Sequence, residues 1–227
     1  MDRHDRTLDT AQGRAWYDKF GRKQDSQDFY AGPALDALVA HADFEHATHL
    51  FEFGCGTGHF ARRLFEHELS AAAHYTGVDV SPVMVGLATE KLRSHEARAQ
   101  VIASDGGIRF PLQAASVDRV VSNYVLDLMS DEDARTCFAE ARRCLVPGGK
   151  LCLVSLGEGN TPASRLVCAL WSRLFRWRPT LVGGCRPIRL LAHVDRERWR
   201  VAYHETITAF GVPSEVCVLE RLPDAID

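Results

Sequence analysis

Three glycines and several acidic residues have the spacing of a ligand site. The glycines alternate in the stretch FEFGCGTGHF, directly after an apolar run, and an acidic residue precedes them. Further polar residues follow where later apolar runs end. The candidate binding residues are Glu52, Gly54, Gly56, Gly58, Asp79, Val80, Asp105, Gly106 and Asn123.

The chemistry of this set favours a nucleoside cofactor that carries positive charge. Glycines between a strand and a helix let a ligand approach the backbone, and the helix N-terminus offers free N–H groups. Asp79, 25 residues after Gly54, is placed to accept both hydroxyls of a ribose. Asp105 can accept from the exocyclic amine of adenine. Glu52 can face a positive ligand group or hold the loop through backbone N–H groups. Clustered carboxylates repel a pyrophosphate and suit a sulfonium and an ammonium group.

Two common nucleotide motifs do not match the loop. A dinucleotide site has the pattern G-x-G-x-x-G, and His59 stands where its third glycine belongs. A phosphate-binding P-loop ends in G-K-[ST], which is missing here. A tight turn without a ligand remains the alternative for the loop taken alone.

The apolar runs alternate with helical patterns, which predicts a parallel sheet covered on both faces. Ser81 and Pro82 are expected to begin one helix, and acidic residues after Ser130 to begin another. Two strands joined near Gly211 predict an antiparallel edge pair. The fold class is α/β: a doubly wound, mostly parallel seven-stranded sheet in a single domain. Expected strands are 49–53, 73–80, 99–105, 117–123, a run after the turn VPGG, and two edge strands within 199–221 that are joined through Gly211, Pro213 and Ser214.

Five motifs in a fixed order resemble the class I S-adenosylmethionine-dependent methyltransferases. They are FEFGCGTG, GVDVSPVMV, ASDGG, DRVVSNYVLDL and LVPGGKLCLVSL, and they span about residues 48 to 156. The resemblance is to the ubiquinone/menaquinone-type branch of small-molecule and lipid enzymes. It implies that the glycines hold the methionine part of S-adenosylmethionine and that Asp79 holds its ribose. It also implies that Asp105 and Gly106 border adenine, and that Asn123 lines the site.

The resemblance divides the chain into four segments. Residues 1–47 are expected to form a helical cap in which Tyr17, Phe20, Phe29 and Tyr30 either line the pocket or pack on the core. The cofactor-binding core is 48–157, a lid or substrate insert 158–198, and the edge strands 199–221. The catalytic residue stays unknown: Asp127, Tyr30 and His59 are candidate bases, and an ordinary structural role is the alternative for each.

Composition excludes several classes of function. The net charge of −3 and a pI near 6.4 argue against nucleic-acid binding, and no Pro-Pro-aromatic run follows Asn123. Seven cysteines without C-x-x-C spacing predict buried, reduced thiols and no metal site. No secretory signal or membrane-spanning run is visible, so we expect a cytoplasmic protein.

Positive charge gathers in one segment. Residues 161–200 hold nine arginines against two acidic residues. On a helical wheel of 163–177, Arg165, Arg173 and Arg176 share a narrow face opposite a wide apolar one that carries Trp171 and Trp177. Such a helix is either a lid over an apolar pocket, which we favour, or a peripheral membrane contact. Both favour an apolar or amphiphilic acceptor.

The sequence therefore predicts methyl transfer from S-adenosylmethionine to a small-molecule or lipid-like acceptor. One alternative is a phospholipid N-methyltransferase at the membrane surface. Two others belong to different classes: a nicotinamide-dependent oxidoreductase and a cofactor-binding module without catalysis. The oxidoreductase is disfavoured by His59 and by the lack of a Tyr-x-x-x-Lys pair. Oligomeric state is not predicted.

Overall fold

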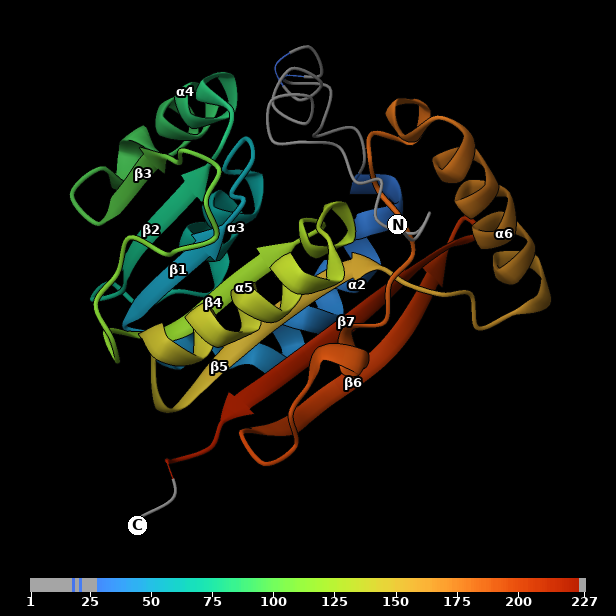
Figure 1. The fold of residues 1–227 in the computed structure, drawn as a ribbon. Coiled ribbons are helices and arrows are strands. Elements are labelled where there is room, and N and C mark those ends of the chain that lie inside the picture. The colour runs from blue at the N-terminus through green and yellow to red at the C-terminus, as the bar shows by residue number, and fades with distance from the viewer. Residues whose placement is uncertain (1–17, 19–20, 22–27, 225–227) are drawn as a thin grey trace.

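The structure is a computed structural model that describes residues 18, 21 and 28–224. Within these residues it contains a seven-stranded sheet in the order β3-β2-β1-β4-β5-β7-β6 (Figure 1). Strands β1 to β5 run parallel, and β7 is antiparallel to both β5 and β6. The predicted doubly wound sheet with an antiparallel edge pair is confirmed. The strands are β1 (His49–Phe53), β2 (His74–Asp79), β3 (Ala99–Ala103), β4 (Val117–Asn123), β5 (Leu145–Leu156), β6 (Trp199–Ala209) and β7 (Val212–Arg221).

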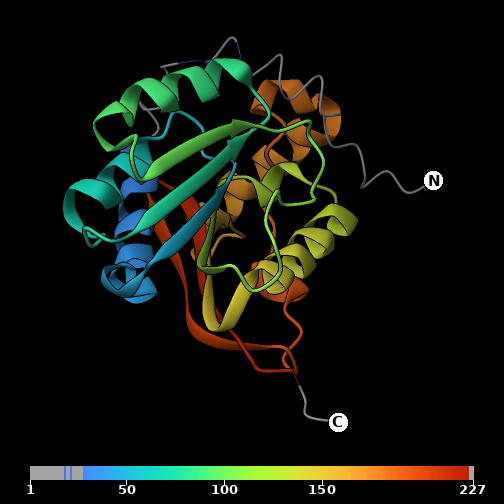
Figure 2. The same cartoon turned by 90° about the vertical axis from the view of Figure 1, so that its left-hand side faces the viewer.

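Helices cover both faces of the sheet, as the two views in Figures 1 and 2 show. On one face lie α2 (Asp28–Ala42), α3 (His59–His67) and α4 (Pro82–Lys91); on the other lie α5 (Asp131–Cys144) and the segment 188–194. Each face of the sheet has its own hydrophobic core, and side chains that alternate along β5 contribute to both. Cys152 and Val154 enter the first cluster, and Leu151 and Leu153 enter the second.

The helix starts follow their local sequence. The Ser81 hydroxyl accepts from the Met84 N–H at 3.2 Å with Pro82 next to it, and the Ser130 hydroxyl accepts from the Asp133 N–H at 3.1 Å. Helix α6 (Pro162–Trp177) begins with a capping box, one residue before the predicted segment. Figure 1 shows α6 at the periphery of the molecule, beside the β6–β7 pair.

The expected turn at VPGG is instead part of β5. Val117 pairs with Leu145 and Arg119 with Lys150, so β5 has extra residues opposite β4 and bulges there. Gly148, with φ +79°, takes the conformation that the bulge needs. The hairpin between β6 and β7 is tighter than expected, because Phe210 and Gly211 both have positive φ and form a two-residue turn.

All seven cysteines are free, and six of them are buried. Burial raises the pKa of Cys137 and Cys152 to about 12, so these thiols stay protonated and behave as small apolar side chains. No helix within the described ranges has the length and apolar composition needed to cross a bilayer.

The candidate cofactor site

The glycine loop lies at the carboxyl edge of the sheet, between β1 and α3. Gly54, Gly56 and Gly58 have φ values of +78°, +52° and +74°, a region in which a side chain is strained. A Cβ on Gly54 would lie 2.3 Å from a methyl carbon of Val125, and one on Gly58 would lie 3.0 Å from Ala88. Gly54 and Gly58 thus have no room for a side chain, because the loop packs closely against Val125 and Ala88. The sequence pattern alone had assigned all three glycines to the approach of a ligand.

Asp79 connects the end of β2 to this loop. One carboxylate oxygen accepts from the Gly56 N–H at 2.9 Å, and the other accepts from the Ser81 N–H at 2.9 Å. Burial raises the pKa of Asp79, and the N–H groups of Ser81, Gly56 and Val80 oppose that rise. The carboxylate is half-buried, so it remains accessible to a ligand while it fixes the loop.

Glu52 lies beneath the loop and is 2% exposed. The Tyr75 hydroxyl donates to it at 2.7 Å, and no hydrogen bond from the loop to Glu52 is found in the described part of the chain. Burial raises the pKa of Glu52 to about 8, against the opposing effect of Tyr75 and of the Asn123 amide beside it. A buried carboxyl group with this pKa is protonated at neutral pH until a positive charge arrives, which suits the ammonium or sulfonium of a cofactor.

Asn123 ends β4 at the same edge. Neither polar atom of its side chain makes a hydrogen bond of standard geometry, although both are buried. The next residue, Tyr124, has a φ of +56°, which is strained for an aromatic residue. The Asn123 amide lies beside the Glu52 carboxyl group and lowers its pKa, so the two side chains line the same part of the site.

Asp105 is exposed and forms a turn. Its carboxylate accepts from the Gly107 N–H at 2.8 Å, and the Gly106 N–H donates to the Ser104 hydroxyl. It also borders a hollow of about 320 Å³ whose other lining includes Phe53, Val78, Ile102 and Phe110. The lining is mostly apolar, with Ser104, Asp105 and Arg109 as its polar members, and such a hollow suits a flat ring that bears an amine.

The structure adds residues that the sequence pattern does not reveal. The Asp18 carboxylate accepts from the Ser81 hydroxyl at 2.5 Å, which places Asp18 beside the site. The ammonium of Lys91 donates to Thr57 at 3.1 Å and ties α4 to the loop. The only sequence signal was the mixture of aromatic and acidic residues around Asp18.

The candidate bases and the aromatic residues of the expected cap lie at different places in the structure. Tyr30 and Tyr124 form an edge-to-face pair, with ring centroids 5.9 Å apart. Asp127 is buried near them, while His59 lies in the first turn of α3 and is half-buried. Tyr17 and Phe20 lie outside the described residues, and the side chain of Phe29 is not described.

The site so built defines an α/β protein that binds a nucleoside-type cofactor across the carboxyl ends of its strands. Comparison with known proteins makes the class specific. Residues 50–149 match the model of the methyltransferase domain family. An uncharacterized methyltransferase of Bacillus subtilis, YrrT, is 32% identical over 47% of this chain and 44% of its own length. A malonyl-[acyl-carrier protein] O-methyltransferase of Hahella chejuensis is 35% identical over 45% of this chain and 34% of its own length. The matched region therefore spans less than half of these relatives.

Solved structures agree in fold. The N-methyltransferase NodS of Bradyrhizobium japonicum, in complex with S-adenosyl-L-homocysteine, has a TM-score of 0.62 at 19% identity, over 85% of this chain and 87% of its own. A putative methyltransferase of Haloferax volcanii, solved with the Trm112 activator, has a TM-score of 0.67 at 15% identity, over 94% and 99%. Residues 50–149 are therefore similar to methyltransferase domains, and the chain shares the fold of solved methyltransferases, one of which holds S-adenosyl-L-homocysteine.

Proposed function

We propose that this protein transfers the methyl group of S-adenosylmethionine to a small molecule with an apolar or amphiphilic skeleton. The observation that carries the proposal is the joint arrangement of Asp79 and Glu52 around the glycine loop. Asp79 fixes the loop at the Gly56 N–H, and Glu52 places a buried carboxyl group below it.

Each part of the cofactor has a matching group in the chain. Gly54, Gly56 and Gly58 face its methionine portion, and Glu52 meets the positive charge. Asp79, with Val80 next to it, receives the ribose hydroxyls. Asp105 and Gly106 border adenine at the apolar hollow, and Asn123 lines the site from β4. When bound, the cofactor supplies an electrophilic methyl group. The protein's main contribution is to hold the acceptor in line with that group, since proximity and orientation supply much of the rate of such reactions.

The wild-type protein is expected to bind S-adenosylhomocysteine and not NADH in calorimetry. Asp79→Ala removes the ribose acceptor and the anchor of the Gly56 N–H, so the free energy of S-adenosylhomocysteine binding should weaken by about 1.5–3 kcal/mol. Asp105→Asn serves as the graded comparison, because it replaces an exposed rim acceptor and should cost about 1–2 kcal/mol. Unchanged affinity in a folded Asp79→Ala protein would refute the assignment. Binding of NADH instead would support an oxidoreductase, and binding without any transfer would support a cofactor-binding module.

Helix α6 points to a second property of the protein. Of its apolar arc, Cys168 and Phe175 are buried, and Trp171 donates through its indole N–H to the Cys185 carbonyl at 2.9 Å. Leu166, Leu170, Leu174 and Trp177 are exposed, with exposed fractions of 63% for Leu166 and 77% for Trp177. A helix acting only as a lid would bury its whole apolar arc, and this one buries about half.

We therefore propose that the inner arc of α6 covers the acceptor side and that the outer arc contacts an anionic membrane surface. The outer arc comprises Leu166, Leu170, Leu174 and Trp177, and its neighbours on the helix surface are Arg165, Arg173 and Arg176. Apolar residues beside arginines are the pattern of a helix that lies in a lipid interface. Such a contact would give the enzyme access to lipid-like acceptors, including phospholipid amines.

Replacing Arg165, Arg173 and Arg176 by Gln should abolish binding to anionic vesicles. Each arginine contributes on the order of 1 kcal/mol near such a surface, and salt screens this term. Co-sedimentation with phosphatidylglycerol vesicles at low and high salt measures it. The matched control changes Arg196, Arg198 and Arg200, which carry the same charge elsewhere in the basic segment, and should bind as the wild type does. If the wild type fails to bind at low salt and Trp171→Ala impairs turnover, α6 is a lid alone.

A further inference from the structure

The side chain of Asp127 is buried near the end of β4, and the proposed cofactor contacts do not use it. Asp127 is in a short 3-10 helix, Leu126–Leu128, four residues after Asn123, and is 1% exposed. Its Oδ1 atom has no hydrogen-bond partner among the described residues. Buried polar atoms are seldom left without a partner, so this oxygen indicates a ligand that completes its hydrogen bonding.

The surroundings of Asp127 are aromatic and apolar. Tyr30 from α2 and Tyr124 from the end of β4 lie near it, and both rings are largely enclosed. The Tyr124 hydroxyl is 2.7 Å from the Ser214 hydroxyl, so that ring is held in place. Two tyrosine rings beside a carboxyl group form a surface for a flat or apolar molecule with one polar end.

The remaining charged and titratable neighbours do not neutralise Asp127. The backbone N–H of Arg186 donates to the backbone carbonyl of Asp127 at 3.0 Å. The guanidinium of Arg186 is directed elsewhere: it donates to the Asp131 carboxylate at 2.7 Å and to the Met129 carbonyl. The Cys185 thiol lies against the carboxyl group. The segment that carries Cys185 and Arg186 is tied to α6 through Trp171. The carboxyl group is therefore enclosed and held by its surroundings without an ion pair to Arg186.

We propose that Asp127 is the catalytic group that receives the methyl acceptor and removes its proton, an inference that rests on the proposed function. The acceptor is then a molecule with a hydroxyl or amine group on an aromatic or otherwise apolar skeleton. Its O–H or N–H donates to Oδ1 of Asp127 while the skeleton lies against Tyr30 and Tyr124.

The methyl transfer needs only the acceptor, S-adenosylmethionine and Asp127. The acceptor's oxygen or nitrogen forms a bond to the methyl carbon, and the carbon–sulfur bond breaks with its electron pair left on sulfur. The sulfonium becomes a neutral thioether. The proton of the acceptor passes to Asp127 and leaves to solvent when product departs.

The titration of Asp127 suits this role. Burial raises the pKa of Asp127 to about 7, against the opposing effects of backbone N–H groups, the Arg186 charge and the Cys185 thiol. A base works best with a pKa near the working pH. Because only the ionised form accepts a proton, activity should rise with pH up to about 7 and then level.

The test compares wild type with Asp127→Asn, which keeps the shape of the side chain and removes its basicity. Tritium-labelled S-adenosylmethionine is incubated with an organic-solvent cell extract as the acceptor pool, from pH 5.5 to 8.5. We expect transfer to fall at least a hundredfold in Asp127→Asn, with S-adenosylhomocysteine affinity within threefold of wild type. The pH dependence below 7 should disappear. The infrared difference spectrum of the S-adenosylhomocysteine-loaded proteins, wild type minus Asp127→Asn, should show a carboxyl group that titrates near pH 7.

Asp118→Asn is the matched control. Asp118 is a carboxylate at the amino end of β4, the strand that precedes Asp127, where it accepts from the N–H groups of Thr48 and His49 at 2.8 and 3.0 Å. Transfer per folded molecule and its pH dependence should stay as in the wild type.

The outcomes separate this inference from the proposed function. Transfer by Asp127→Asn within fivefold of wild type, with the same pH profile, would overturn the role of Asp127 and leave the methyltransferase assignment intact. If Asp127→Asn does not fold, the wild-type profile decides, and a flat rate between pH 5.5 and 8 contradicts the inference. A wild type that binds no S-adenosylhomocysteine rejects the proposed function and this inference with it.

Discussion

Gly54→Ala should lower the free energy of unfolding by about 2–5 kcal/mol and weaken S-adenosylhomocysteine binding at least tenfold. Two costs combine. The backbone of Gly54 has a φ of +78°, which costs a residue with a Cβ about 1–2 kcal/mol. The added Cβ would also lie 2.3 Å from a methyl carbon of Val125, so either the loop or the segment after β4 must move. Both segments border the cofactor site.

Urea unfolding and calorimetry measure the two effects of Gly54→Ala. Adding Val125→Ala removes the clash and leaves the backbone strain, so the double variant should recover part of the lost stability. Gly86→Ala is the matched control. Gly86 is an exposed helical glycine of α4, and a Cβ added there would have nothing within 4 Å, so alanine should stabilise by about 0.5–1 kcal/mol. Equal stability of Gly54→Ala and Gly86→Ala would contradict the packing argument.

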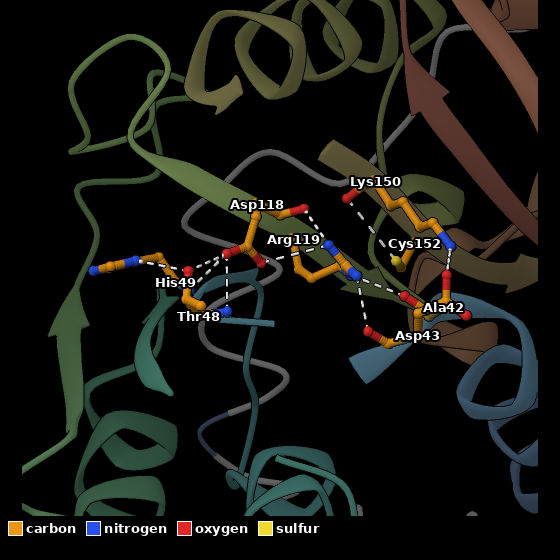
Figure 3. A network of polar contacts seen from close by, with 8 residues as sticks. All are labelled: Ala42, Asp43, Thr48, His49, Asp118, Arg119, Lys150 and Cys152. Atoms are coloured by element: carbon orange, nitrogen blue, oxygen red, sulfur yellow. Dashed lines mark hydrogen bonds and ion pairs between the residues drawn. The ribbon is translucent and has the colours of Figure 1, made fainter. Parts of the chain in front are cut away.

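Arg119→Met should lower the free energy of unfolding by about 3–5 kcal/mol, the usual cost of breaking a buried charged network. The guanidinium, 7% exposed, donates to the backbone carbonyls of Ala42 and Asp43 at 2.8 Å each and to that of Asp118 at 2.9 Å (Figure 3). It thereby satisfies carbonyls at the end of α2 and fastens that helix to β4. Lys150 supports the same corner through an ion pair with Asp43 (Figure 3).

The Arg119 prediction also separates stability from binding. The network lies at the amino end of β4, opposite the cofactor edge, so the folded fraction of Arg119→Met should bind S-adenosylhomocysteine with wild-type affinity. Arg62→Gln is the control, because the exposed Arg62–Glu66 pair at 3.1 Å should contribute less than about 1 kcal/mol. Comparable losses in the two variants would show that burial of Arg119 does not matter.

Features set by neighbouring residues were predictable from the sequence. The strands of the parallel core follow from their apolar runs, and their bounds are reproduced within a few residues. The starts of α4 and α5 follow from Ser81 and Ser130, because a cap depends on groups two or three residues away. The spacing also predicted that Asp79 lies beside the glycine loop, since parallel strands bring their carboxyl ends to one edge. The bulge in β5 was not recognised, because it depends on the pairing with β4.

Contacts between distant segments were decided only by the tertiary structure. No local pattern reveals that Val125 keeps Gly54 small, that Tyr75 donates to Glu52, or that Asp18 reaches Ser81. The helical wheel of α6 shows a wide apolar arc, but which half of it is buried depends on where the helix packs. The elements, the order of the motifs and the class of cofactor could be predicted from the sequence, because each depends on short-range geometry. The orphaned oxygen of Asp127 and the buried network of Arg119 arise only when the folded chain removes water from groups that are far apart in sequence.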